Sequence, residues 1–294
     1  MSDSNAYGTL FMPNFQDLSK VVAKTIPILE TDPNNVLVLI DCLVDFIHKN
    51  GALPVKGAIE DTRRTGQFIV NNLSKIKNIE IMEDTHQIYQ IFHAAYWTNK
   101  EGKHPDPFTV IKLDDLKTWT PKCELEWAIT YLEKVGQLII WPYHTFEGSI
   151  GRCVDPALLE ILYYWSFVRE QKLNFHAKGT LAESEMYGAF APEVWIGNIP
   201  NGSFNQLLLG HLLTHEKMIF AGQAKSHCVL TTLQQICNRL RAFAPSRIKD
   251  IYVLTDCMSN VQHPEIDFDE ITKIEFEKLA KYGMNFVTST ELEL

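Results

Sequence analysis

The feature that most constrains the fold is a series of six short, unbroken apolar runs along the chain. They lie at 35–40, 79–82, 138–141, 173–176, 218–221 and 251–254. Continuous apolar runs of this length are typical of strands buried on both faces. Helical patterns stand between several of them, for example at 156–167 and 271–280. Strands alternating with helices predict a three-layer α/β/α fold around a central, mostly parallel sheet of about six strands.

Polar side chains follow five of these runs directly. The residues of interest are Asp41 after the first run, Asp84 and His86 after the second, His144 after the third, Lys178 after the fourth and Cys228 after the fifth. In open parallel sheets, ligands bind outside the carboxyl ends of the strands. We therefore expect these side chains, nearly two hundred positions apart at the extremes, to converge on one crevice.

Composition excludes several classes of protein. The formal charge is −9, from 27 basic and 36 acidic side chains, and no Lys/Arg cluster favours nucleic acid or an anionic membrane as a partner. No apolar run approaches the roughly 20 residues of a membrane helix, and residues 1–10 lack the pattern of a signal peptide. We expect a cytoplasmic protein that acts on a small molecule.

Three segments depart from the regular alternation. Residues 1–33 contain three prolines and are expected to form an N-terminal arm, which packs on the domain or covers a neighbouring subunit. Residues 34–294 are expected to form a single domain with an insertion at about 98–136. The segment 191–204 is expected to be a loop near the mouth of the site. No internal repeat or low-complexity tract suggests a further division.

Cys228 is the candidate nucleophile. It stands between the fifth apolar run and a helical pattern at 229–240, so it lies near a helix N-terminus. That position favours a thiolate, and backbone N–H groups there can hold an oxyanion. In isolation such a cysteine is as typical of a small buried residue at a tight turn. That structural interpretation is kept for Cys42, Cys123, Cys153, Cys237 and Cys257.

Two charged residues can assist Cys228. Asp41 ends a strongly apolar run, where an ionised carboxylate needs a partner or serves as a cap. Lys178 also ends a run, and an ammonium beside a thiol lowers its pKa while a nearby carboxylate accepts its proton. Taken alone, Lys178 is typical of an ordinary surface lysine.

Asp84, His86 and His144 have the pattern of a metal site. An Asp-x-His pair leaving a strand, with a histidine from another strand end, can form a set of three ligands with open positions. The set suits zinc, iron or manganese. His93 is a further candidate ligand, because its segment can face either the metal or the core.

Four motifs occur in order between residues 36 and 261. They are DCLVDF at 41–46, DTH at 84–86 with WPYH at 141–144, KG at 178–179 with YGAF at 187–190, and GQAKSHCV at 222–229. These motifs resemble those of the isochorismatase-like cysteine hydrolases, most closely the nicotinamidase branch. The resemblance implies the Rossmann-like isochorismatase-like hydrolase fold. It also implies an Asp41, Lys178, Cys228 triad that cleaves an amide to carboxylate and ammonia through a thioester.

The resemblance also implies further roles. The N–H groups of Ala224 and Cys228 would form the oxyanion hole, with a cis peptide between Gln223 and Ala224. Zinc or a similar ion at Asp84, His86 and His144 would bind a lone pair of the substrate. Phe46, Trp141 and Tyr187 would flank a flat substrate.

The chain departs from the family pattern at the pocket wall. Leu43 replaces a glutamine, Thr85 replaces the tryptophan of D-W-H, and the histidine that follows is displaced to His93. Two alternatives therefore stay open: a metal-free hydrolase of a ureido or vinyl-ether compound, and a non-catalytic protein that retains the fold. We also expect a homo-oligomer, as is common among relatives.

Overall fold

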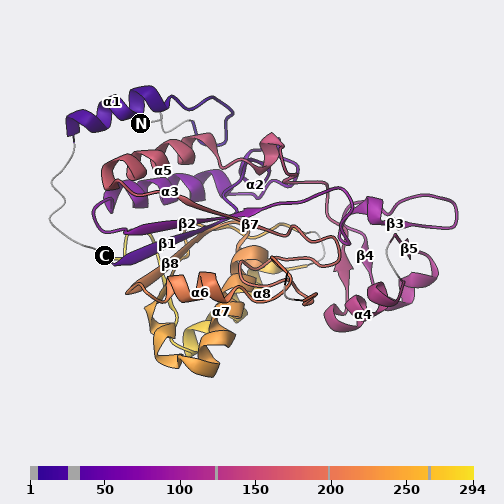
Figure 1. Cartoon of the computed structure of the whole chain (residues 1–294). Coiled ribbons are helices and arrows are strands. Elements are labelled where there is room, and N and C mark those ends of the chain that lie inside the picture. Colours follow the sequence, from indigo (N-terminus) through magenta and orange to yellow (C-terminus); the bar gives the residue numbers. More distant parts are fainter. Residues whose placement is uncertain (1–5, 26–33, 123–124, 198, 264–265) are drawn as a thin grey trace.

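A six-stranded parallel sheet forms the centre of the molecule (Figure 1). The computed structural model describes residues 6–25, 34–122, 125–197, 199–263 and 266–294, and Cys123 lies outside them. The strand order is β10-β9-β8-β1-β2-β7, and each neighbouring pair is parallel. The strands are β1 (Asn35–Ile40), β2 (Asn78–Asp84), β7 (Asn174–Lys178), β8 (Lys217–Gly222), β9 (Ile251–Leu254) and β10 (Asn285–Val287). The predicted α/β class is confirmed.

Helices cover both faces of this sheet (Figure 1). Those on one face are α1 (Phe15–Thr25), α3 (Ala58–Asn71) and α5 (Pro156–Arg169), and those on the other are α6 (Gln206–Leu212), α7 (Leu230–Phe243) and α8 (Phe268–Lys281). Strand β1 shows why its sequence is apolar throughout. Leu37 and Leu39 belong to the hydrophobic cluster under α3 and α5, whereas Val36, Val38 and Ile40 belong to the cluster under α6, α7 and α8.

Helix α5 begins where the sequence supplies a start signal. The Asp155 carboxylate accepts the backbone N–H groups of Ala157 and Leu158, and Pro156 occupies the first helical position. A proline does not weaken the helix at this position, because the backbone N–H that it lacks would have no hydrogen-bond partner inside the helix. Asp155 also accepts the N–H of Gly8 at 3.0 Å, so the described part of the N-terminal arm packs against this same chain.

One predicted strand of the central sheet is wrong. Residues Leu138–Ile139 form β6, which pairs antiparallel with β4 (Val110–Ile111), and β10 takes the sixth place in the central sheet. The run at 138–141 is apolar because it is buried in a third hydrophobic cluster, which includes Ile140 and Trp141. The apolar run at 138–141 correctly predicted that this segment is buried. It did not predict which sheet the segment joins.

The third cluster joins the region that the sequence predicted as an insertion, at about 98–136, to the segments on either side of it. Here β3 (Trp97–Thr98) pairs with β5 (Thr120–Pro121), and α4 (Leu125–Val135) packs beside them. This region projects from one side of the main body in Figure 1. The shorter helical turns of the chain are α2 (Val44–Ile47), η1 (Ala94–Tyr96), η2 (Leu113–Lys117), η3 (Ile150–Arg152), η4 (Lys225–Val229) and η5 (Pro245–Asp250).

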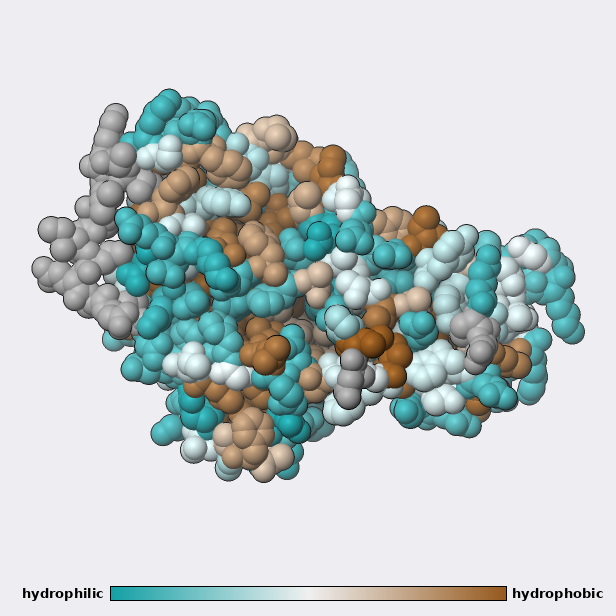
Figure 2. All heavy atoms as spheres, in the orientation of Figure 1, coloured by the Kyte–Doolittle hydropathy of each residue, from teal (hydrophilic) through white to brown (hydrophobic). Residues whose placement is uncertain are grey.

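The molecular surface is mixed in character. On the face shown in Figure 2, hydrophilic side chains predominate and apolar ones form separate patches. Among the described residues, no helix has the length and apolar character needed to cross a membrane.

Candidate active site

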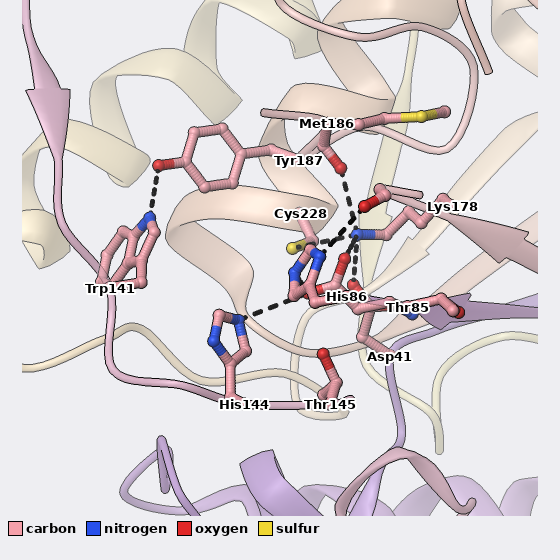
Figure 3. Close-up of polar contacts among 12 residues, drawn as sticks. Asp41, Thr85, His86, Trp141, His144, Thr145, Lys178, Met186, Tyr187 and Cys228 are labelled. Carbon is pink, nitrogen blue, oxygen red and sulfur yellow. Dashed lines mark hydrogen bonds and ion pairs between the residues drawn. The ribbon is translucent and has the colours of Figure 1, made fainter. Parts of the chain in front are cut away.

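Four of the predicted site residues meet at the carboxyl ends of adjacent strands (Figure 3). Asp41 follows β1, Asp84 ends β2 and Lys178 ends β7. Cys228 lies in η4, a π-helical turn that follows β8. Because the sheet order places β8, β1, β2 and β7 side by side, residues from distant parts of the chain share one site.

Lys178 occupies the centre of this group. Its Nζ lies 3.0 Å from Asp41 Oδ2, 2.8 Å from Asp84 Oδ1 and 3.7 Å from Cys228 Sγ, and it donates to the carbonyl oxygen of Met186 at 3.2 Å. The side chain is only 2% exposed, so the interpretation as a surface lysine does not hold. Burial disfavours the ammonium, but Asp41 and Asp84 outweigh it and raise the pKa of Lys178 well above its usual value.

Asp41 is held in an unusual backbone conformation. Its φ is +48°, in the left-handed region that most residues avoid, and its Oδ1 accepts the N–H of Asp84 at 2.8 Å. Burial raises the pKa of Asp41 to about 7, although Lys178 opposes that shift. A carboxyl group with a pKa near neutrality is suited to accepting and returning a proton.

Cys228 is buried in the structure. Burial raises its pKa well above the usual value, and the neighbouring Lys178 only partly offsets this effect. The expectation from the sequence that this turn favours a thiolate stays a prediction. The residue is 7% exposed, and the loss of water around its thiol has a larger effect on the pKa than the ammonium of Lys178. The thiol then needs a base to become nucleophilic.

The remaining described cysteines divide into two kinds. Cys42, Cys237 and Cys257 are buried, as the structural interpretation predicts. Cys153 is exposed, so the expectation of a buried residue is wrong there. It directly follows the surface turn η3, and a single cysteine in the sequence carries no signal that separates the two cases.

The predicted metal ligands come together beside the triad. His86 Nε2 lies 2.8 Å from Asp84 Oδ2, and His144 Nε2 lies 3.5 Å from the same oxygen. The ligand atoms of these three buried residues all lie within 4.8 Å of one another. Among the residues that the structure describes, this is the group of histidine, cysteine and acidic side chains that could hold a metal ion.

The hydrogen bonds of both histidines orient their rings towards Asp84. The Nδ1 of His86 lies 3.1 Å from the carbonyl oxygen of Gly179, and that of His144 lies 2.7 Å from the carbonyl oxygen of Pro142. A carbonyl oxygen only accepts, so both Nδ1 atoms carry a proton, which leaves each Nε2 as the atom that can offer a lone pair on the side of Asp84. Two lone pairs facing a carboxylate repel it unless a cation lies between them. The three residues therefore fit a divalent metal.

His93 lies next to this group but outside it. Its ring centroid is 5.7 Å from that of His86 and 6.0 Å from that of His144, and its Nδ1 donates to the carbonyl oxygen of Gln87 at 2.8 Å. Its Nε2 is buried without a hydrogen-bond partner among the described residues. A role for His93 as a ligand stays a prediction.

A narrow pocket opens beside Cys228. Its lining includes the predicted wall residues Phe46, Trp141 and Tyr187, together with His227. The indole N–H of Trp141 donates to the Tyr187 hydroxyl at 2.9 Å and closes one side (Figure 3). The cavity volume is about 30 Å³, far below the roughly 300 Å³ at the lower end of ligand pockets. A ring-sized ligand therefore enters only when wall side chains move.

The backbone around the predicted oxyanion hole has one unusual feature. The peptide bond between Gln223 and Ala224 is cis, as the family resemblance implies. Ala224 and Cys228 both line the pocket. Their role as oxyanion donors stays a prediction.

Three residues of the site were not predicted from the sequence. Asp45 accepts the N–H of Thr145 at 2.7 Å, which fixes the chain beside His144. Gln90 donates to the carbonyl oxygen of Gly179 at 2.6 Å and so joins the lysine turn to the metal loop. Glu185 lines the pocket, and burial raises its pKa well above its usual value.

The sequence signals for these three residues differ. The second acid of the DCLVDF motif was a usable signal for Asp45. Gln90 and Glu185 lie in irregular segments, where no periodicity places a side chain.

Comparison with known proteins establishes the fold. No protein-family model matches the chain, and no curated protein sequence matches it. Solved structures do match: a nicotinamidase/pyrazinamidase of Acinetobacter baumannii has 20% identity and a TM-score of 0.58, covering 90% of this chain and 100% of that one. The yeast nicotinamidase Pnc1p has 17% identity and a TM-score of 0.56, covering 86% of this chain and 99% of that one.

A third solved structure is a pyrazinamidase of Pyrococcus horikoshii in complex with zinc. It has 16% identity and a TM-score of 0.52, and the match covers 87% of this chain and 99% of that one. The fold of the chain is thus the fold of nicotinamidases and pyrazinamidases. It extends over nearly the whole length of the structures compared.

Proposed function

We propose that the protein is a metal-containing cysteine amidohydrolase that cleaves a nicotinamide-like carboxamide to carboxylate and ammonia. The observation that carries this proposal is the position of Lys178 Nζ, in contact with Asp41 and Asp84 and 3.7 Å from Cys228 Sγ. One buried ammonium thereby links a base, a thiol and the candidate metal ligands. The shared fold with nicotinamidases and pyrazinamidases supports the same class of reaction.

In the first half-reaction, Asp41 takes the thiol proton as Cys228 Sγ bonds to the amide carbon. The ammonium of Lys178 balances the negative charge that moves between these groups, and the N–H groups of Ala224 and Cys228 hold the oxyanion. Asp41 then returns the proton to the amide nitrogen. The C–N bond breaks, ammonia leaves and a thioester remains.

In the second half-reaction, water replaces ammonia. Asp41 takes a proton from the water as its oxygen bonds to the thioester carbon. The C–S bond breaks, the proton returns to Cys228 and the carboxylic acid is released. The pKa of Asp41, about 7, suits both proton transfers.

Asp84, His86 and His144 would hold the metal, for which we propose zinc, with iron or manganese as alternatives. When bound, the metal supplies a Lewis-acidic contact for a lone pair such as that of a ring nitrogen. The zinc complex of the Pyrococcus pyrazinamidase supports this choice. Phe46, Trp141 and Tyr187 would then flank the ring of the substrate.

The test is an ammonia-release screen across nicotinamide, pyrazinamide and larger aryl amides, with metal-free and metal-restored protein. We expect Cys228→Ala to lower turnover by more than about 1000-fold, because no other group supplies the covalent step. Metal content should stay at that of the wild type. Cys153→Ser is the matched control and should keep full activity, because that thiol is exposed outside the pocket.

Three results would contradict parts of the proposal. If Cys228→Ala turns over at the wild-type rate, Cys228 is not the nucleophile. Absence of metal, together with hydrolysis of a ureido or vinyl-ether compound, favours the metal-free alternative. Failure on every substrate, with metal-free and with metal-restored protein, favours a non-catalytic protein.

A further inference from the structure

The segment that follows Lys178 carries two groups of the site without any regular structure of its own. Residues 179–191, named here the strap, contain no helix or strand. The carbonyl oxygen of Met186 accepts from Lys178 Nζ at 3.2 Å, and the hydroxyl of Tyr187 accepts from Trp141 at 2.9 Å (Figure 3). The strap therefore touches both the central ammonium and the pocket wall.

A segment without regular structure needs partners for its backbone groups from elsewhere. The last residues of the strap have such partners on α7, the helix after Cys228. Thr232 Oγ1 accepts the N–H of Ala189 at 3.0 Å, and the Gln235 side chain bonds the backbone of Phe190 and Ala191. The first residues are held by Gln90, which donates to Gly179 and Leu181. The middle, where Met186 and Tyr187 lie, has neither of these anchors.

Helix α4 of the predicted insertion supplies the anchor in the middle. The indole N–H of Trp127 donates to the carbonyl oxygen of Glu183 at 2.8 Å. The hydroxyl of Tyr131 donates to Glu193 at 2.5 Å and accepts the N–H of Glu185 at 3.4 Å. Trp127 and Tyr131 are four residues apart, so they lie on one face of the helix.

Burial and hydrogen bonds hold the Tyr131 side chain in one position. Its side chain is fully buried in the third hydrophobic cluster, which also contains Trp141 of the pocket wall. The N–H of Glu193 donates to the carbonyl oxygen of Glu185 at 2.8 Å, so the partner of Tyr131 is itself bonded to the strap. A shift of α4 therefore moves the strap and the wall together.

We propose that α4 is a positioning element of the active site, acting through Trp127 and Tyr131. These two side chains fix the middle of the strap, so that Met186 holds the Lys178 ammonium and Tyr187 holds the wall. The insertion is then part of the catalytic apparatus and not a peripheral elaboration. This inference rests on the proposed function for its catalytic consequence, whereas the structural coupling stands without it.

The test compares Trp127→Phe and Tyr131→Phe with the wild type. Each removes one polar atom and keeps the ring, so packing is largely conserved. Thr130→Val is the matched control on α4, because the Thr130 hydroxyl donates to Glu126 within the helix. The measurements are the thermal midpoint, kcat and KM for the amide found in the ammonia screen, and hydrogen exchange of the amides at 183–187.

We expect both ring variants to lower kcat about 10-fold and to raise KM about 3-fold, because Met186 no longer positions Lys178 and Tyr187 no longer holds the pocket wall. Exchange at 183–187 should accelerate about 10-fold, with the thermal midpoint within about 3 °C of the wild type. Thr130→Val should match the wild type in every measurement.

Two outcomes would overturn the inference. One is wild-type kcat and wild-type exchange at 183–187 in both ring variants. The other is faster exchange throughout the protein with a large fall in the thermal midpoint, which indicates a structural role alone. If the wild type releases no ammonia from any amide, the proposed function fails, and the exchange comparison still decides whether α4 fixes the strap.

Discussion

Lys178 shows how a side chain acquires a role from its surroundings. Two carboxylates, a carbonyl oxygen and a thiol surround its ammonium, and water is excluded from it. An isolated ammonium in such a place would lose its proton. The two acids keep it charged, and His86 together with this ammonium holds the pKa of the Asp84 carboxyl well below its usual value despite burial.

Lys178→Met should abolish activity and destabilise the fold. The change leaves Asp41 and Asp84 without their shared cation in a buried site, at a cost of about 3–5 kcal/mol in the free energy of unfolding. Chemical denaturation measures the loss. Lys20→Met, which breaks the exposed pair with Asp17, should cost less than about 1 kcal/mol. Equal losses in the two variants would contradict the role of burial.

At the scale of the element, the turn after β7 illustrates a backbone requirement. Gly179 has a φ of +72°, and a Cβ there would lie 2.8 Å from His86 Cε1. Its carbonyl oxygen accepts from both His86 and Gln90. The turn thus joins the lysine strand to the metal ligands, and a side chain larger than hydrogen does not fit.

Gly179→Ala should weaken zinc binding about 10- to 100-fold, because His86 must shift. The strained φ should also lower the free energy of unfolding by about 1–3 kcal/mol. A competition titration with a zinc indicator measures the first effect and denaturation the second. Gly210→Ala is the control: nothing lies within 4 Å of a Cβ there, and α6 should gain up to about 1 kcal/mol. Unchanged zinc affinity in Gly179→Ala would show that the turn does not orient His86.

The sequence predicted which helices and strands exist better than it predicted which strands pair. Strand β1 and helix α5 follow from apolar runs and a cap that the sequence contains. The placement of 138–141 in the central sheet was wrong, and β10 was not predicted. Short apolar runs report burial alone, and β10 is only half-buried along its three residues, so it gives no clear apolar signal.

At the scale of the whole molecule, several buried histidines couple stability to pH. Burial among Trp141, Tyr187 and Phe268 lowers the pKa of His227 to about 4. Its folded pKa lies below the unfolded value of about 6.5, so the unfolded chain binds the proton more readily. The stability contributed by neutral His227 is present above pH 6.5 and is lost as pH falls towards 4.

His227→Phe should therefore reduce the acid sensitivity of the fold. Between pH 7 and pH 5, the wild type should lose about 1–2 kcal/mol more stability than this variant. Denaturation at both pH values measures the difference, and the comparison cancels the buried acids that both proteins share. The exposed His104→Gln should keep the wild-type dependence. An equal loss in His227→Phe and the wild type would contradict the assignment. A homo-oligomer stays a prediction at this scale.

The sequence by itself determined the fold class and singled out the residues of the candidate triad and the candidate metal site. It could do so because burial on both faces demands apolar runs, and because charged residues at strand ends stand out against them. Only the tertiary structure decided the strand order, which brings Asp41, Asp84, Lys178 and Cys228 within contact. It also decided the burial of Cys228 and the attachment of α4 to the strap, because burial and contacts between distant segments depend on which surfaces meet.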